Sequence, residues 1–271
     1  MNQSTQNIES SRTRILSVAN QKGGVGKTTT TINLGTAMAA VGQRVLLIDL
    51  DPQGNASTGL GIDPSERKFT TYDVLVDGVA LEDALLSANV PNLFVTPSSV
   101  DLSSADVELV DDQRRVLRLK AALDELNRSD EEFDLILIDC PPSLNLLTLN
   151  ALAASQTVLV PLQAEFFALE GLSQLMLTIK EVRQSLNPTL KIEGIVLTMF
   201  DRRNNLSLQV ERDVRDNLGD LVYQTIIPRN VRLSEAPSFG MPAILYDHKS
   251  AGSVAYQKLA AEMLRREKAV P

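Results

Sequence analysis

The sequence predicts an α/β fold: a single doubly wound domain built around a mainly parallel sheet. Short apolar runs alternate with stretches of helical spacing along the chain, and neither a repeat nor an internal linker interrupts this alternation. Several runs are apolar at every position instead of every second one, which is typical of strands that are covered on both faces. The expected strands are residues 15–19, 45–48, 93–95, 135–138, 157–160, 192–198 and 222–227.

Apolar residues spaced three or four positions apart predict helices between these strands. The first stripe is closed by Gly42, a residue type that often ends a helix, and the third is stopped by Pro188. Residues 1–12 are rich in Asn, Gln and Ser and predict a flexible tail, followed by one domain over residues 13–271. The three stripes are Leu34, Met38 and Val41; Val116, Leu119, Leu123 and Leu126; and Leu169, Leu172, Met176, Ile179, Val182 and Leu186.

Composition excludes several classes of protein. The 271 residues are 44% hydrophobic and 22% charged, which is enough apolar material for a large core. The single cysteine, Cys140, excludes a disulfide framework and a cluster of thiolate ligands, and the single histidine, His248, argues against a histidine metal site. No apolar run approaches the roughly 20 residues of a membrane span. We therefore expect a soluble, cytoplasmic protein without a membrane partner.

The charge is unevenly distributed along the chain. The net charge is −8, but residues 1–200 carry 15 basic and 25 acidic side chains, whereas residues 201–271 carry 11 and 9. Such asymmetry is a weak indication of an anionic partner near the C-terminal part.

The strongest motif is a glycine-rich loop, QKGGVGKTT, at residues 21–29. It follows an expected strand and opens an expected helix, which is the setting of a phosphate-binding loop. Glycines let successive backbone N–H groups point at phosphate oxygens, Lys27 can reach the β- and γ-phosphates, and the Thr28 hydroxyl can ligate Mg²⁺. The standard motif has glycine where this chain has Gln21. The expected ATP contacts are Lys22, Gly23, Gly24, Val25, Gly26, Lys27, Thr28 and Thr29.

Acidic residues end two of the expected strands. Asp139 follows the apolar run 135–138, where a carboxylate would lie beside Mg²⁺ and contact it through a water molecule. Asp49 ends run 45–48 at the same level of the sheet, in the second shell of the metal. Asp51 lies two residues further on, and its spacing alone is equally compatible with a turn or an N-cap.

Five sequence blocks together resemble the ParA/MinD-type ATPases, whose phosphate loop departs from the standard motif and carries an additional lysine, here Lys22. Three of the blocks, DPQGN, ALEG and IPRNVRLSEAP, are similar to those of the ParA/Soj chromosome-partitioning ATPases. The blocks lie at residues 22–28, 49–55, 139–143, 168–171 and 227–237.

This resemblance implies a P-loop fold and a set of roles for individual residues. Lys22 would reach the phosphates bound by a second subunit, so that the protein forms a homodimer with ATP, and Asp51 would position the attacking water. Together with Lys27, these residues form the implied catalytic set, and ATP and Mg²⁺ are the implied cofactors. The resemblance also implicates Met199, Pro228 and Asn230 in holding the base.

The resemblance further points to Arg203 and Arg232 as contacts to double-stranded DNA, made without reading its sequence. Arg202 and Arg229 lie beside them in the chain, and arginines in loops can grip backbone phosphates. The alternative is that these arginines are solvated or paired with neighbouring acids. For Arg212 and Arg215, which share a helical segment with acids, we favour that alternative.

The implied function is a partition ATPase that dimerises with ATP, binds DNA non-specifically on the nucleoid and is released when a ParB-type centromere-binding partner stimulates hydrolysis. Chromosome, plasmid and protein cargo remain open as alternatives. A MinD-like membrane-cycling ATPase would need a basic amphipathic C-terminal helix, and the apolar face of residues 256–268 is thin and better suited to packing on the body. A nitrogenase-type iron protein is excluded because it needs two cysteines in each chain.

Overall fold

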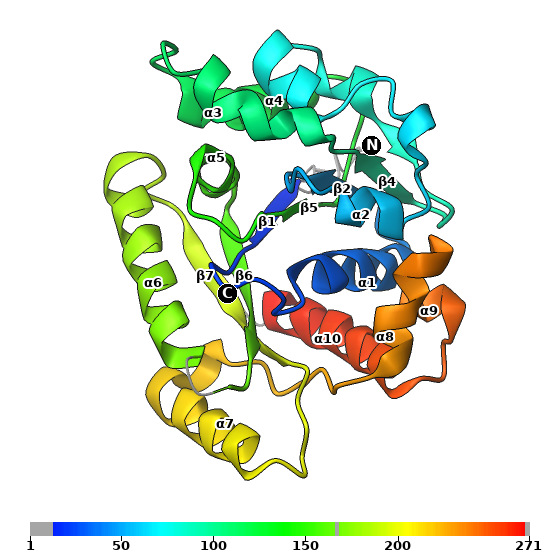
Figure 1. The fold of residues 1–271 in the computed structure, drawn as a ribbon, viewed down its shortest axis with the longest axis vertical. Coiled ribbons are helices and arrows are strands. Elements are labelled where there is room, and N and C mark those ends of the chain that lie inside the picture. The colour runs from blue at the N-terminus through cyan, green and yellow to red at the C-terminus, as the bar shows by residue number, and fades with distance from the viewer. Residues whose placement is uncertain (1–12, 166–167, 269–271) are drawn as a thin grey trace, which may run out of the picture.

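The computed structural model describes residues 13–165 and 168–268, and in this part of the chain it contains one seven-stranded sheet (Figure 1). The strand order is β3-β4-β2-β5-β1-β6-β7, and every neighbouring pair is parallel except β3 with β4. The predicted α/β class with a mainly parallel sheet is confirmed, whereas the expected tail, residues 1–12, lies outside the described residues. The strands are β1 Arg14–Val18, β2 Val45–Asp49, β3 Leu86–Ser87, β4 Leu93–Thr96, β5 Leu135–Asp139, β6 Thr157–Gln163 and β7 Lys191–Thr198.

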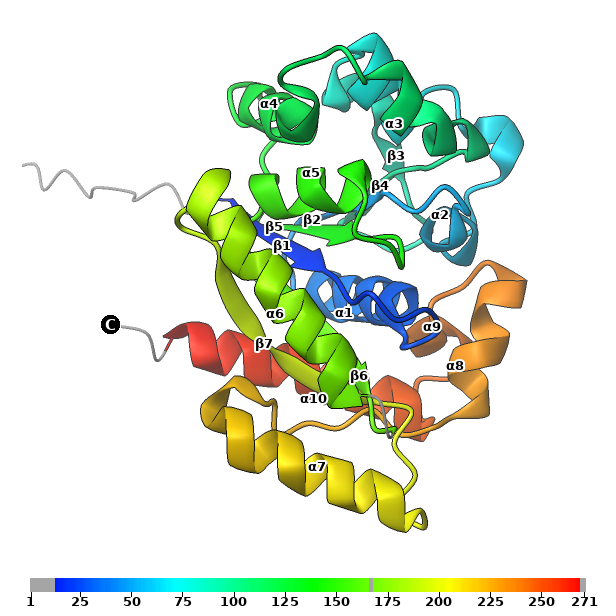
Figure 2. The ribbon, with the colours of Figure 1, turned by 60° about the vertical axis from the view of Figure 1, so that its left-hand side comes forward.

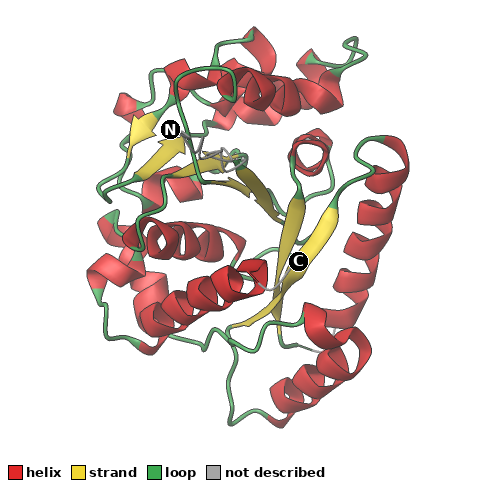
Figure 3. Ribbon diagram, turned by 180° about the vertical axis from the view of Figure 1, so that it is seen from behind, coloured by secondary structure: helices red, strands yellow, loops and turns green. Residues whose placement is uncertain are grey.

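Helices cover both faces of the sheet, as Figures 2 and 3 show. Helices α1 and α10 pack on one face, and α4, α5 and α6 pack on the other. Short helices α8 and α9 lie beside α1 and α10 (Figure 1). The helices are α1 Lys27–Ala40, α2 Asn55–Gly59, α3 Ala105–Glu108, α4 Arg118–Leu126, α5 Leu146–Ala154, α6 Ala168–Ser185, α7 Asn205–Leu218, α8 Val231–Glu235, α9 Ala243–Tyr246 and α10 Ala251–Lys268, with the 3₁₀ turn η7 at Ala236–Phe239.

The two helical layers explain why the strands are apolar at every position. Successive residues of a strand point to opposite faces, so Ile15 joins the core under α4–α6 and Leu16 joins the core under α1 and α10. Leu259 and Met263 of α10 are fully buried in the second core. The apolar face of the C-terminal helix therefore packs on the body, as expected. Among the helices of the described ranges, none combines the length and the apolar character needed to cross a bilayer.

Parallel pairing places the functional strand ends side by side. Asp139 at the end of β5 is in register with Asp49 on β2 and with Val18 on β1. The phosphate loop begins three residues after Val18, so the loop and both carboxylates meet at the carboxyl edge of the sheet, where ligands bind in open α/β folds.

Two local predictions were wrong. The expected strand at residues 222–227 forms only isolated bridges, Ile195 with Val222 and Phe200 with Pro228. The Glu262 carboxylate of α10 accepts hydrogen bonds from the backbone N–H groups of residues 224 and 225, at 2.8 Å each, and so withdraws them from a ladder. Val41 is exposed because α1 ends one residue earlier, although Gly42 does close the helix with φ of 95°.

Candidate nucleotide-binding site

The glycine-rich loop has the backbone of an anion cradle. Gly24 and Gly26 adopt left-handed conformations with φ of 72° and 86°, which few other residues tolerate. Helix α1 begins at Lys27 directly after Gly26, and no side chain caps its N-terminus. The N–H groups of its first turn thus remain available to a bound phosphate, and the helix dipole favours a negative charge there.

Lys27 is buried to 7% exposure although it carries an ammonium group. Its Nζ donates a 3.2 Å hydrogen bond to the Lys22 carbonyl oxygen at the start of the loop. Burial lowers the pKa of Lys27, and the nearby Asp139, Cys140 and Asp51 act in the opposite direction. A phosphate group bound in the loop would therefore meet a cation that is poorly solvated and preoriented.

Thr28 and Asp139 meet at the start of α1. The Thr28 hydroxyl donates to Asp139 Oδ2 at 2.7 Å, and the Thr31 hydroxyl donates to Oδ1 of the same carboxylate at 2.9 Å. A hydroxyl and a carboxylate beside the phosphate cradle are the hard oxygen ligands that Mg²⁺ prefers, and Mg²⁺ usually completes its shell with phosphate oxygens and water. The residues present thus fit the expected metal.

Asp49 fixes the segment that follows β2. It is fully buried, and its Oδ2 accepts hydrogen bonds from the backbone N–H and the hydroxyl of Ser57 at 2.9 and 2.6 Å. Its Oδ1 accepts a 3.2 Å bond from the Asp51 N–H. Burial raises the pKa of Asp49 and of its in-register neighbour Asp139, and the charge of Asp49 adds to the rise at Asp139. Asp49 is thus bonded to α2 rather than open to a ligand.

Asp51 begins a tight turn between β2 and α2. Its Oδ1 accepts a 3.0 Å hydrogen bond from the Gln53 N–H, and its carbonyl oxygen accepts one from the Gly54 N–H at 2.8 Å. Gly54 has φ of 63°, and a Cβ atom there would lie 2.7 Å from the Arg67 guanidinium. Arg67 in turn donates to Thr58 Oγ1 on α2. The turn is therefore held by its own hydrogen bonds at Asp51 and by Arg67 at Gly54. The charge of Asp51 also acts on Lys27, where it favours a higher pKa.

The Lys22 side chain is paired with a carboxylate from another part of the chain. Its Nζ forms a 2.6 Å ion pair with Glu165, which follows β6. Sequence reasoning did not find Glu165, because the two residues are 143 positions apart and no motif joins them.

The loop expected to hold the base contacts the phosphate loop directly. The Thr198 hydroxyl at the end of β7 donates to the Val25 carbonyl oxygen at 2.7 Å, a contact that the sequence did not reveal. Met199 adopts a left-handed backbone with φ of 49°, and its Cε would lie 3.8 Å from a Cβ placed on Gly26. Pro228 bridges to Phe200 beside it, so Met199 and Pro228 do lie on one side of the loop. The Asn230 side chain caps α8 through the Arg232 N–H.

Three of the four candidate DNA-binding arginines share one cavity. Arg202, Arg203 and Arg229 line a cavity of about 1140 Å³ that also includes Lys258, Arg265 and Arg266 of α10. Arg203 is 90% exposed and forms two hydrogen bonds to Asp201, which lower the pKa of that carboxyl to about 2. Among the described residues, Arg202 and Arg229 form no ion pair.

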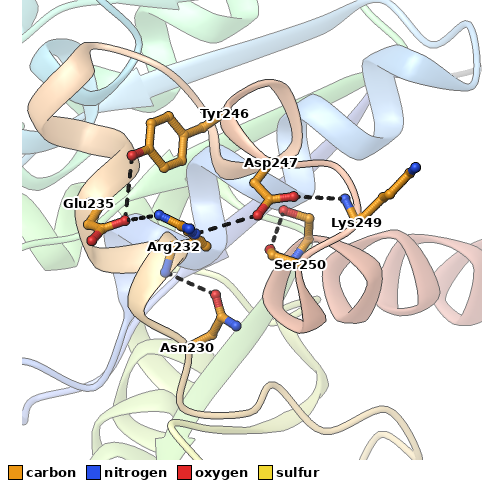
Figure 4. Close-up of polar contacts among 8 residues, drawn as sticks. Asn230, Arg232, Glu235, Tyr246, Asp247, Lys249 and Ser250 are labelled. Carbon is orange, nitrogen blue, oxygen red and sulfur yellow. Dashed lines mark hydrogen bonds and ion pairs between the residues drawn. The ribbon is translucent and has the colours of Figure 1, made fainter.

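Arg232 belongs to a separate cluster on α8. Figure 4 shows its guanidinium between Glu235 and Asp247, at 2.8 and 3.5 Å. The structure therefore separates Arg232 from the arginine cavity, although the sequence grouped them. Arg215 pairs with Glu211 on α7, as the acidic neighbours of that helix indicated.

Comparisons with known proteins identify the family. A model described as an AAA domain matches residues 13–192. The chromosome partitioning protein ParA of Caulobacter vibrioides is 60% identical over 255 residues, which cover 94% of this chain and 95% of that one. The sporulation initiation inhibitor protein Soj of Bacillus subtilis is 52% identical over 250 residues, covering 92% and 98%.

A solved structure has the same fold over nearly the whole chain. Cobyrinic acid a,c-diamide synthase from Mycobacterium smegmatis, with bound ADP and magnesium, matches with a TM-score of 0.82 at 40% identity and covers 96% of this chain and 97% of that one. The predicted P-loop fold is confirmed, and the expectation of an ATP- and Mg²⁺-dependent enzyme is confirmed at the level of the family. The chain belongs to the ParA/Soj family of chromosome-partitioning ATPases.

Proposed function

We propose that this protein is a partition ATPase that dimerises with Mg-ATP, binds double-stranded DNA without sequence preference as a dimer, and leaves the DNA after hydrolysis. A ParB-type centromere-binding protein would stimulate that hydrolysis, and the cargo would be a chromosome or a plasmid. The observation that carries the proposal is the meeting of Thr28 with Asp139 at 2.7 Å, next to buried Lys27 at the open end of α1.

In this proposal, the backbone N–H groups of residues 23–29 and the Lys27 ammonium hold the nucleotide phosphates. Thr28 would ligate Mg²⁺ directly and Asp139 through a water, and the ion would neutralise charge on the β- and γ-phosphates. Met199 and Pro228, which flank the loop on the β7 side, would contact the base together with Asn230.

Asp51 would orient the attacking water from the turn after β2. Its support is the rigidity of that turn: the Asp51 N–H is bonded to Asp49, and Gly54 is packed against Arg67. Lys22 would contact the nucleotide bound by a second copy of the chain. Its side chain is paired with Glu165 and is exposed at 37%, so a partner can reach it.

DNA binding would use the arginine cavity and the Arg232 cluster of two subunits. Duplex DNA should be repelled by a chain of net charge −8 unless local positive surfaces outweigh it, and one subunit offers few arginines. A dimer doubles their number, which makes DNA binding dependent on ATP. Contacts of this kind grip phosphates and do not read bases.

The test is to measure dimerisation by light scattering and binding of random-sequence DNA by gel shift, on the same samples, with ATP, with ADP and without nucleotide. We expect dimers and DNA complexes with ATP alone. ATP-dependent binding to vesicles of anionic phospholipid, with no binding to DNA, would instead support the membrane-cycling alternative.

A further inference from the structure

Lys22 and Glu165 form an ion pair at the rim of the nucleotide site. Lys22 Nζ lies 2.6 Å from Glu165 Oε2, and the two side chains are 37% and 47% exposed. The Gln163 side chain also donates to Glu165 Oε1 and so orients the carboxylate. The pair is thus accessible to solvent and to any second molecule that approaches this edge.

The backbone of Lys22 is held by hydrogen bonds, whereas its exposed ammonium group is held by the ion pair with Glu165. The Lys22 N–H donates to Asn20 Oδ1 at 3.0 Å, and Asn20 Nδ2 donates to the Pro161 carbonyl oxygen on β6 at 2.8 Å. On the other side, the Lys22 carbonyl oxygen accepts from Lys27 Nζ. These bonds hold the start of the phosphate loop against β6, so Lys22 can exchange the partner of its ammonium group by side-chain rotation alone.

We propose that Glu165 is a positioning residue that holds Lys22 within its own subunit and competes with the nucleotide of the second subunit for it. This inference rests on the proposed role of Lys22 in dimerisation. A polyphosphate carries more negative charge than one carboxylate and therefore wins the competition, whereas encounters of subunits that carry no nucleotide leave the internal pair intact. Glu165 thereby lowers the affinity of the nucleotide-bound dimer and leaves nucleotide-free encounters unaffected.

The expected size of the effect follows from the exposure of the pair. An exposed ion pair changes an equilibrium constant by up to about fivefold. Because each of the two subunits releases one such pair, the dimer dissociation constant of a Glu165→Gln variant should fall by up to about 25-fold.

The experiment compares Glu165→Gln with a matched control, Asp124→Asn. Asp124 pairs with Lys120 at 3.3 Å, and these side chains are 47% (Lys120) and 50% (Asp124) exposed. The control therefore removes a similar lysine–carboxylate pair and the same charge on α4. Thermal unfolding first establishes that both variants fold. Lys22 and Lys120 are then acetylated in the nucleotide-free protein and followed by mass spectrometry, and dimerisation is measured by sedimentation with a non-hydrolysable ATP analogue.

We expect Glu165→Gln to raise the acetylation rate of Lys22 by about two- to fivefold and leave Lys120 unchanged, with the reverse in Asp124→Asn. We also expect tighter dimers in Glu165→Gln alone. Unchanged Lys22 acetylation, or unchanged or weaker dimerisation in Glu165→Gln, would overturn the inference while leaving the proposed function standing. If wild-type protein forms no dimer with the analogue, the proposed function fails, and this inference fails with it.

Discussion

The Thr28 hydroxyl and the Asp139 carboxylate are joined by a 2.7 Å hydrogen bond that links the first turn of α1 to the end of β5. The bond joins residues 111 positions apart in the sequence. It also places a fully buried carboxylate beside another one, because Asp49 is the in-register neighbour of Asp139. The fold therefore places two buried carboxyl groups next to each other, at the position where a divalent cation is expected.

That arrangement predicts a pH dependence of stability in the nucleotide-free protein. Burial, with the Asp49 charge, raises the pKa of Asp139 to about 8, well above its value in an unfolded chain. The folded state therefore binds more protons than the unfolded state between about pH 4 and about pH 8, and the free energy of unfolding should fall as the pH rises through that window, by up to about 1.4 kcal/mol per pH unit. Urea unfolding of wild type and Asp139→Asn in EDTA measures it, and the variant should show the shallower decline. Equal slopes would contradict the assignment.

Lys27→Ala should weaken ATP binding by about 100-fold or more, since it removes the buried ammonium group beside the phosphates. Titration with a fluorescent ATP analogue measures the affinity. Lys22→Ala is the internal comparison: it should keep nucleotide affinity but lose ATP-dependent dimerisation, because its proposed target lies on the other subunit. Wild-type affinity in Lys27→Ala would remove this lysine from the site.

Asp51→Ala should bind Mg-ATP but hydrolyse it about 100-fold or more slowly, because the attacking water loses its orientation. Size exclusion after incubation with ATP should then find the variant dimeric and the wild type mostly monomeric. Phosphate release is the direct measurement. Turnover at the wild-type rate would leave Asp51 with its structural role in the turn only.

Thr198→Val should weaken ATP binding several-fold, since loss of the hydroxyl leaves the buried Val25 carbonyl oxygen without this donor, at about 1–2 kcal/mol. Thr157→Val is the matched control on the neighbouring strand. The Thr157 hydroxyl is buried without a hydrogen-bond partner in the described ranges. Its removal should therefore leave the free energy of unfolding unchanged or raise it. Titration calorimetry with ATP on both variants measures the difference, and equal affinities would show that the Thr198 contact does not matter for the loop.

Arg203→Glu and Arg232→Glu should abolish DNA binding while leaving ATP-dependent dimerisation largely intact. Arg202→Glu and Arg229→Glu should do the same, because these two arginines form no ion pair in the described part of the chain. Exposed Arg128, which follows α4 and does not line the arginine cavity, supplies the control Arg128→Glu. If each subunit neutralises two phosphates, log K should fall against log[salt] with a slope of about −3 to −4. Gel shifts over a salt series test this, and a patch whose reversal leaves binding unchanged is wrongly assigned.

Local sequence patterns predicted much of the site and of the fold. The glycine loop could be predicted because its spacing, its preceding strand and its following helix are contiguous, and Asp139 because it ends an apolar run. Glu165 and Thr198 could not, since their partners lie far away in the chain and are reached only through the sheet. Residues 222–227 read as a strand because nothing local shows that Glu262, on α10, takes two of their N–H groups.

The hydrogen bond from Thr198 to Val25 also acts as a mechanical linkage. Arg202 follows Thr198 by four positions, and Met199 between them has a left-handed backbone. A shift of the phosphate loop would therefore be passed through the Thr198 hydrogen bond and four residues of chain to Arg202, at the rim of the arginine cavity. Arg232 lies on α8, where it is paired with Glu235 and Asp247, and these pairs do not connect it to the phosphate loop. The two arginine surfaces should therefore respond to nucleotide differently. The arginine cavity should move with the phosphate loop of its own subunit, whereas the Arg232 cluster should reach its DNA-binding position only when the subunits join.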